Sequence, residues 1–144
     1  MRRTICYGST GYTVEFEWPT AKDLLQMKKN VAIKFKDLKF KKCSKDSNVF
    51  GAFQVVLSNG SCSPVFAAQG ENEQNMQSVN IQDYSIVKRV NGSYGTAIHK
   101  LSFKKKDGNE ITKVETGWNA NPYYSSDSVI ADDEEIIGVF GTKD

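Results

Sequence analysis

The segment Ala97-Ile-His-Lys-Leu-Ser-Phe103, with the residues that follow it, decides the fold class. Lys104-Lys-Lys-Asp-Gly-Asn109 comes next, and Glu110-Ile-Thr-Lys-Val-Glu115 then resumes the alternation of apolar and polar side chains. Alternation with a period of two residues is typical of half-buried β-strands, and Asp-Gly is typical of tight hairpin turns. This order predicts a strand, a turn and a second strand, and therefore an antiparallel β protein.

The first half of the chain shows the same alternation. Tyr12 to Trp18 predicts a half-buried strand, which Pro19 would stop. Apolar residues alternate again from Val31 to Phe40, but the phase shifts by one residue near Lys36-Asp37, which predicts a turn or a β-bulge there. The apolar side chains of this stretch fit a core face, and its many lysines fit a solvated outer face.

Turn residues separate the strands that follow. Phe50 to Leu57 predicts a strand, and Asn59-Gly60 predicts a hairpin that leads into a return strand over Ser61 to Phe66. Asn91-Gly92 predicts another turn. The polar run from Gln69 to Gln77 predicts a mobile loop.

One stretch favours a helix. Thr20 to Lys29 would form two or three turns at most, with Thr20 as the N-cap and Asp23 three residues later. Strands otherwise recur about every 8 to 12 residues, the spacing of antiparallel sandwiches, barrels and prisms. We therefore predict an all-β fold, β-prism-like with three sheets or alternatively a β-sandwich, with at most one short helix.

Size and composition indicate one domain over residues 1–144. The formal net charge is +2, so the balance does not favour a nucleic-acid partner. No run approaches the about 18 apolar residues that span a bilayer. The first ten residues lack the apolar region of a signal peptide, which predicts a cytoplasmic protein. Cys6, Cys43 and Cys62 are odd in number and widely spaced, so we expect reduced, unbridged thiols and no zinc site. One disulfide with a spare thiol is the less favoured alternative.

Several motifs resemble the jacalin-related lectins. Phe53-Gln-Val-Val-Leu-Ser-Asn-Gly60 is similar to that family's I-Q-V-x-Y-x-N-G pattern, and Ile98-His-Lys-Leu-Ser-Phe103 to its I-x-S-L-T-F strand. Lys106-Asp-Gly108 stands at the family's short turn, and Glu135-Ile-Ile-Gly-Val-Phe-Gly141 is similar to K-I-V-G-F-x-G. The jacalin-like region covers about residues 50–141. The resemblance implies a β-prism of three antiparallel sheets and a non-enzymatic binding role.

The chain departs from the family where the family binds sugar. An N-terminal Gly-Gly is missing, since Ser9-Thr10 separates Gly8 from Gly11, and Gly141-Thr-Lys-Asp144 is one residue short of the late G-x-x-x-D loop. The family's closing strand is expected after that loop. We expect its place to be taken by the extra strand within residues 1–18 or by a strand from a partner chain.

An aromatic loop is the best candidate for ligand contact. Aromatic faces stack on sugars and amides bond to hydroxyls, and loops on rigid scaffolds commonly carry binding sites. A structural plug at the end of the domain is an equally good interpretation of these rings. The predicted ligand-binding residues are Trp118, Asn119, Tyr123, Tyr124 and Asp144.

Other clusters favour structural roles. The carboxylates between Asp127 and Glu135 could bind calcium, but a solvated acidic loop explains them better. His99 is the only histidine and lies in an alternating strand, so we predict no catalytic site, no metal and no cofactor. We predict a non-catalytic recognition or assembly module that binds a protein partner or joins a larger complex as a structural subunit. A carbohydrate-binding lectin domain is the first alternative, and an enzyme is the second.

Overall fold

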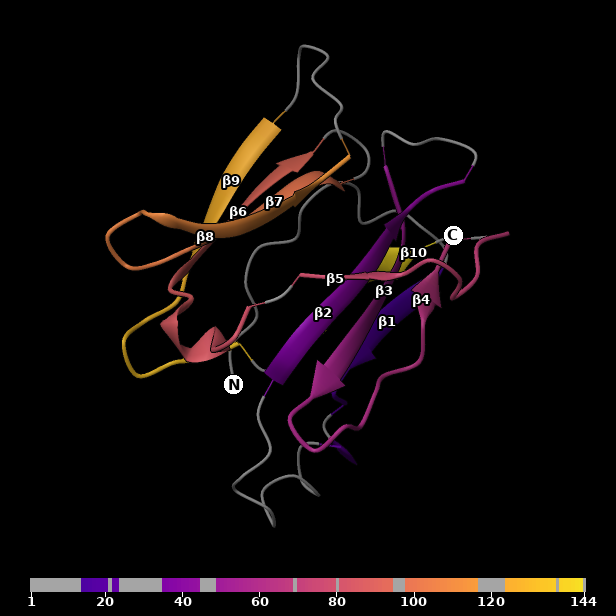
Figure 1. The fold of residues 1–144 in the computed structure, drawn as a ribbon, viewed down its shortest axis with the longest axis horizontal. Helices are drawn as coiled ribbons and strands as arrows, with labels where there is room; N and C mark the ends of the chain where they lie inside the picture. Colours follow the sequence, from indigo (N-terminus) through magenta and orange to yellow (C-terminus); the bar gives the residue numbers. More distant parts are fainter. Residues whose placement is uncertain are drawn as a thin grey trace.

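The computed structural model describes residues 14–20, 22–23, 35–44, 49–68, 70–79, 81–94, 98–116, 124–136 and 138–143. The described chain is all-β apart from one 3-10 turn and the start of one helix, as the sequence predicted (Figure 1). Its elements are β1 (Val14–Trp18), β2 (Phe35–Lys42), β3 (Phe50–Leu57), β4 (Phe66–Ala67), β5 (Gln77–Ser78), η1 (Tyr84–Ile86), β6 (Arg89–Tyr94), β7 (Ile98–Lys104), β8 (Glu110–Glu115), β9 (Tyr124–Val129) and β10 (Val139–Lys143).

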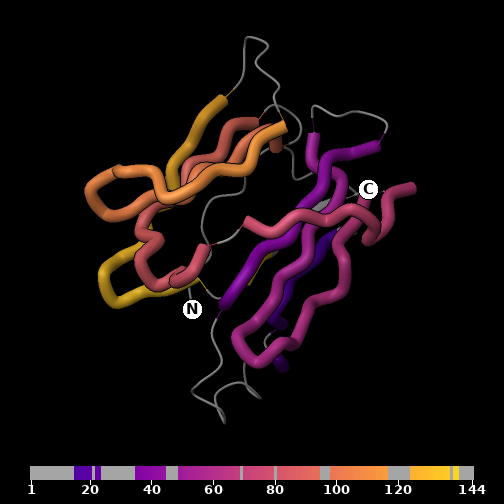
Figure 2. Tube along the Cα trace, in the orientation of Figure 1, coloured from indigo at the N-terminus to yellow at the C-terminus, as the bar shows by residue number. Residues whose placement is uncertain are grey.

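The strands form three antiparallel sheets. The first sheet has the order β4-β3-β2-β5, the second has the order β8-β7-β6-β9, and β1 pairs with β10 in a third sheet of two strands. The tube view separates the second sheet, drawn from salmon to orange, from the first sheet in purple and magenta (Figure 2). Each four-stranded sheet is built from one continuous stretch of chain, whereas the third sheet joins the two ends of the described chain.

The predicted change of phase in the first sheet is a β-bulge. The β2–β3 register shifts between Phe35 and Asp37, so that Phe35, Leu38 and Phe40 all face the core. A bulge adds one residue to one strand, which shifts the alternation of the later side chains by one position. Apolar residues on both sides of the shift therefore point to the same face of the sheet. The structure therefore confirms the core-face interpretation of the apolar residues between the lysines.

The Asn59-Gly60 hairpin is confirmed. Leu57 N–H donates to Ser61 O at 2.8 Å, and Gly60 has a φ of 86°, which favours glycine. The return strand is shorter than predicted. The Val55 N–H donates to Ser63 Oγ at 2.9 Å, and Ser63 Oγ itself donates to Pro64 O. A side-chain oxygen thus accepts the Val55 N–H in place of a backbone carbonyl.

The second sheet confirms one predicted turn and corrects another. The Asp107-Gly108 turn joins β7 to β8, with Gly108 N–H donating to Lys105 O at 3.0 Å. The prediction of a turn at Asn91-Gly92 is wrong, because Gly92 lies inside β6 between Leu101 of β7 and Ser126 of β9. Pairing on both sides of β6 outweighs the local preference of Asn-Gly for a turn.

The predicted N-terminal strand and helix start are both present. β1 ends at Trp18, one residue before Pro19. Thr20 and Asp23 form a reciprocal capping box: Asp23 N–H donates to Thr20 Oγ1 at 3.2 Å, and Thr20 N–H donates to Asp23 Oδ2 at 2.9 Å. The rest of the predicted helix lies outside the described residues.

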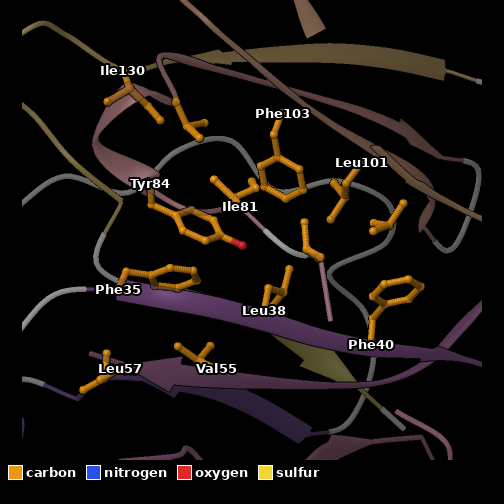
Figure 3. Close-up of a cluster of buried hydrophobic side chains, with 13 residues drawn as sticks. Phe35, Leu38, Phe40, Val55, Leu57, Ile81, Tyr84, Leu101, Phe103 and Ile130 are labelled. Atoms are coloured by element: carbon orange, nitrogen blue, oxygen red, sulfur yellow. The ribbon is translucent and has the colours of Figure 1, made fainter. Parts of the chain in front are cut away.

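One core lies between the first two sheets (Figure 3). Val55 of β3 is completely buried, and the Tyr84 ring packs between Phe35, at 4.6 Å between ring centroids, and Phe103, at 6.2 Å. Burial, and then the nearby charge of Asp37, raises the pKa of Tyr84. Trp18 and Val139 of the third sheet pack against the same core from its margin. All three sheets therefore share one apolar interior.

Candidate functional site

Tyr124 is the predicted ligand residue that the structure describes. It begins β9, pairs with Tyr94 at the end of β6, and is 66% exposed. The two ring centroids lie 6.0 Å apart with an interplanar angle of 31°. The Tyr94 hydroxyl and Ser126 Oγ lie 3.1 Å apart in a hydrogen bond. The other predicted ligand residues lie outside the described residues: Trp118, Asn119, Tyr123 and Asp144.

The tyrosine pair lies on the core-facing side of the second sheet. Side chains alternate along β6, so Tyr94 is on the same side as Gly92, whose partner Leu101 is in the core. The partner of Tyr94 across the sheet is Tyr124, which therefore also lies on this side. Its high exposure places Tyr124 outside the core that the described residues form. A rigid strand thus presents an accessible aromatic ring, and aromatic rings bind protein side chains and sugar faces well.

A polar network occupies the opposite side of the same ribbon. The Asn91 amide donates from Nδ2 to Asp127 Oδ1 at 2.7 Å and to Ser125 Oγ at 2.9 Å. Ser125 Oγ lies 3.3 Å from Asn91 Oδ1 in a second hydrogen bond. The amide, hydroxyl and carboxylate are the polar groups that hydrogen-bond sugar hydroxyls. This network and the tyrosine pair are separate surfaces, because successive strand residues point to opposite sides.

The acidic segment is stabilised by local contacts. Ala131 N–H donates to Glu134 Oε1 at 2.9 Å, and Lys106 Nζ donates to Asp132 Oδ2 at 2.7 Å. The hydrogen bond from Lys106, and then its positive charge, lowers the pKa of Asp132. Lys88 Nζ donates to Glu134 O at 2.7 Å and ties this loop to the start of β6. Within the described ranges, no group of three or more His, Cys, Asp or Glu side chains is arranged to hold a metal ion.

The loop predicted to be mobile is anchored through Glu71. Its carboxylate accepts hydrogen bonds from Ser44 N–H at 2.6 Å, Ser44 Oγ at 2.7 Å and Cys43 Sγ at 3.2 Å. Lys41 Nζ lies 3.4 Å from the other carboxylate oxygen, and the Glu71 side chain is only 2% exposed. A Cβ at Gly51 would lie 2.7 Å from Cys43 Cα, so glycine permits this close approach. No local motif marked Glu71, because its partners lie far away in the sequence.

These partners set the charge state of Glu71. The side-chain and backbone hydrogen bonds from Ser44, followed by that from Cys43, lower its pKa to about 2. Each donor favours the ionised carboxylate over the protonated form. Glu71 is therefore ionised at any pH above the low acidic range and holds the loop to the end of β2.

We expect the Glu71→Gln variant to be less stable than wild type at neutral pH. A carboxylate whose pKa is lower in the folded than in the unfolded state stabilises the fold above its unfolded pKa of about 4.3. That contribution is lost as the pH falls toward the folded pKa of about 2. Urea unfolding between pH 7 and pH 2 should show the stability difference shrinking on acidification. A difference that stays constant with pH would contradict the proposed role of the charge.

Cys43, Cys62 and His99 lie among contacts that connect neighbouring strands and turns. Cys43 and Cys62 carry free thiols, and Cys6 lies outside the described residues. His99 is buried, and its carbonyl oxygen accepts hydrogen bonds from Thr116 N–H at 2.9 Å and Thr116 Oγ1 at 3.1 Å. Cys62 Sγ lies 3.6 Å from Gly60 O, within its own turn. Each of these contacts holds one strand or turn to its neighbour.

No helix within the described ranges has the length and apolar character required to cross a bilayer. No family model and no curated protein matches the chain. Among solved structures, that of a lamprey immune protein is similar at 14% sequence identity, with a TM-score of 0.45. The similarity covers 78% of this chain but only 38% of the lamprey protein, so the chain spans well under half of its length.

Proposed function

We propose that this chain is a non-catalytic recognition or assembly module that binds a protein partner. One observation carries this proposal: Tyr124 is 66% exposed on the core-facing side of a rigid sheet, beside Tyr94. Tyrosine provides a large contact area at a small entropic cost and is enriched at the centres of protein interfaces. We propose that the partner is a protein, and that the chain can act as a structural subunit of a larger complex.

We further propose a β-prism architecture of the jacalin-related type, in which β1 and β10 belong to the third sheet. Three antiparallel sheets that share one core support this architecture. A non-catalytic role is supported by the environment of the titratable groups. Glu71 and Asp132, whose pKa values are lowered, engage donors that hold loops in place.

Carbohydrate binding is the second candidate. The Asn91–Ser125–Asp127 network favours it, because a half-buried amide and an exposed hydroxyl and carboxylate are already positioned by mutual hydrogen bonds. In this case the ligand would contact the outer side of the β6–β9 ribbon. The tyrosine pair lies on the other side of that ribbon.

The test compares Tyr124→Ala with a control, Val129→Ala, which removes another exposed apolar side chain of β9, 59% accessible, on the outer side of the sheet. Cross-linking in the native source followed by mass spectrometry should identify a protein partner. Tyr124→Ala should weaken its binding about tenfold or more, as expected for a tyrosine at an interface centre, while Val129→Ala binds as wild type. A glycan array with Asn91-dependent binding and no protein partner would replace this proposal with the lectin function.

A further inference from the structure

The dipeptide Asn-Gly occurs twice in this chain, and the structure gives the two copies different surroundings. Asn59-Gly60 lies in the turn after β3, where both residues and the serine that follows them are exposed. Asn91-Gly92 lies inside β6, where Gly92 is buried and paired with strands on both sides. The same two residues are therefore accessible in one place and constrained in the other.

An asparagine followed by glycine can lose ammonia without an enzyme. The backbone nitrogen of the glycine attacks the side-chain carbon Cγ, the bond from Cγ to Nδ2 breaks, and a five-membered succinimide ring forms. The proton of the glycine N–H passes through water to the departing nitrogen, which leaves as ammonia. Water then opens the ring at either carbonyl group and gives aspartate or isoaspartate. Glycine favours the attack because it carries no side chain beside the nitrogen and its backbone rotates freely.

Two hydrogen bonds of the exposed turn act on this attack in opposite directions. Ser61 N–H donates to Asn59 Oδ1 at 2.9 Å. It therefore stabilises the negative charge that develops on this oxygen when Cγ is attacked. Gly60 N–H donates to Leu57 O at 3.0 Å, and this bond must open before the nitrogen can react. Opening costs little free energy in an exposed turn at the end of a strand.

The turn also has room for the product. Isoaspartate carries the main chain through the former side-chain Cβ, so that the turn becomes one atom longer. Around Gly60 the structure is open, since a Cβ added there would meet no atom within 4 Å. The longer turn can therefore form without displacing the first sheet.

The second copy is held against the same reaction. Asn91 Nδ2, the nitrogen that would leave, donates to Asp127 Oδ1 at 2.7 Å and to Ser125 Oγ at 2.9 Å. Ring closure also requires the asparagine backbone to leave its extended conformation, which in β6 would disrupt the pairing with β7 and β9. Opening an inner strand costs a free energy that approaches that of global unfolding.

We propose that Asn59 is a site of spontaneous deamidation, at which Asn59-Gly60 is converted through a succinimide to aspartate or isoaspartate while the second sheet protects Asn91-Gly92. The only co-reactant is water. A carboxylate replaces a neutral amide, which lowers the formal net charge by one, from +2 to +1. The site belongs to the first sheet, and the inference is independent of the proposed function, which rests on the tyrosine pair of the second sheet.

The experiment follows both copies in the same sample. The purified protein is kept in mildly alkaline buffer at physiological temperature, and mass spectrometry of its peptides measures the conversion of amide to acid at each asparagine over time. We expect Asn59 to react at least about a hundredfold faster than Asn91, because only Asn91 requires an inner strand to open. Equal rates in the folded protein, or an Asn59 that stays intact while denatured chain is converted, overturn the proposal.

Denatured protein provides the matched control for the effect of the fold. In guanidinium chloride the two copies should react at similar rates, because the dipeptide is the same. If the difference between them persists there, it comes from the neighbouring sequence and the proposal is wrong. Asn59→Gln provides a second control, since glutamine cannot form the five-membered ring. The acidic species that the wild type accumulates should be absent from this variant, and its appearance would place the modification elsewhere.

Discussion

Gly138→Ala should destabilise the protein by about 3 kcal/mol, the upper part of the range for forced overpacking. A methyl group at this position would collide with the Trp18 carbonyl oxygen and the Pro19 ring. Both belong to the backbone or to a rigid ring, so neither can move aside without displacing the end of β1 from β10. The free energy of unfolding from urea titration measures the effect.

Gly60→Ala is the matched control for this substitution. Gly60 has a left-handed backbone conformation, with a φ of 86°, but a Cβ at this position would meet no atom within 4 Å. Gly60→Ala should lower the free energy of unfolding by only about 1 kcal/mol, the cost of placing a side chain in the left-handed region. If Gly138→Ala were as mild as Gly60→Ala, the contact between β10 and the Trp18–Pro19 segment would not be important for stability.

Deletion of Met1 to Trp18 should abolish the cooperative unfolding transition. The truncation removes β1, which pairs with β10, together with the Phe16 ring on Phe66 and the Trp18 side chain against the core. Unpaired strand edges and an uncovered core margin both disfavour a compact native state. Thermal unfolding can be followed by far-ultraviolet circular dichroism, which reports secondary structure, and by near-ultraviolet circular dichroism, which reports side-chain packing. The two signals of the truncated protein should change over broad temperature ranges that do not coincide.

A shorter deletion of Met1 to Thr13 controls for the residues before β1. It keeps all five residues of β1 and should retain a cooperative transition. Unchanged melting of the longer truncation would mean that β1 is dispensable. In that case the two-stranded sheet would contribute little to the fold.

The features that sequence predicted best are determined locally. The change of phase near Lys36-Asp37 marks the β-bulge, because a bulge shifts side-chain alternation by one residue. Asn59-Gly60 and Asp107-Gly108 form turns because both glycines adopt a positive φ. Thr20 and Asp23 form a capping box because the required side chains lie three residues apart.

The failures come from contacts between distant residues. Asn91-Gly92 has the same local signal as Asn59-Gly60, but strands paired on both sides of β6 hold it extended. That error also concealed Tyr94, since only the pairing of β6 with β9 places it beside Tyr124. Glu71 was assigned to a polar loop because its partners at Cys43 and Ser44 are on another strand end. The tyrosine pair and the carboxylate anchor thus depend on tertiary structure.

The joining of the chain ends in the third sheet has a consequence for the folding pathway. The first two sheets pair strands that are near in sequence, whereas β1 and β10 must close a loop that contains almost the whole domain. Closing such a loop is entropically costly, so these contacts should form after the folding transition state. Gly138→Ala should then accelerate unfolding and leave the refolding rate nearly unchanged. The native protein would open first where its two ends meet.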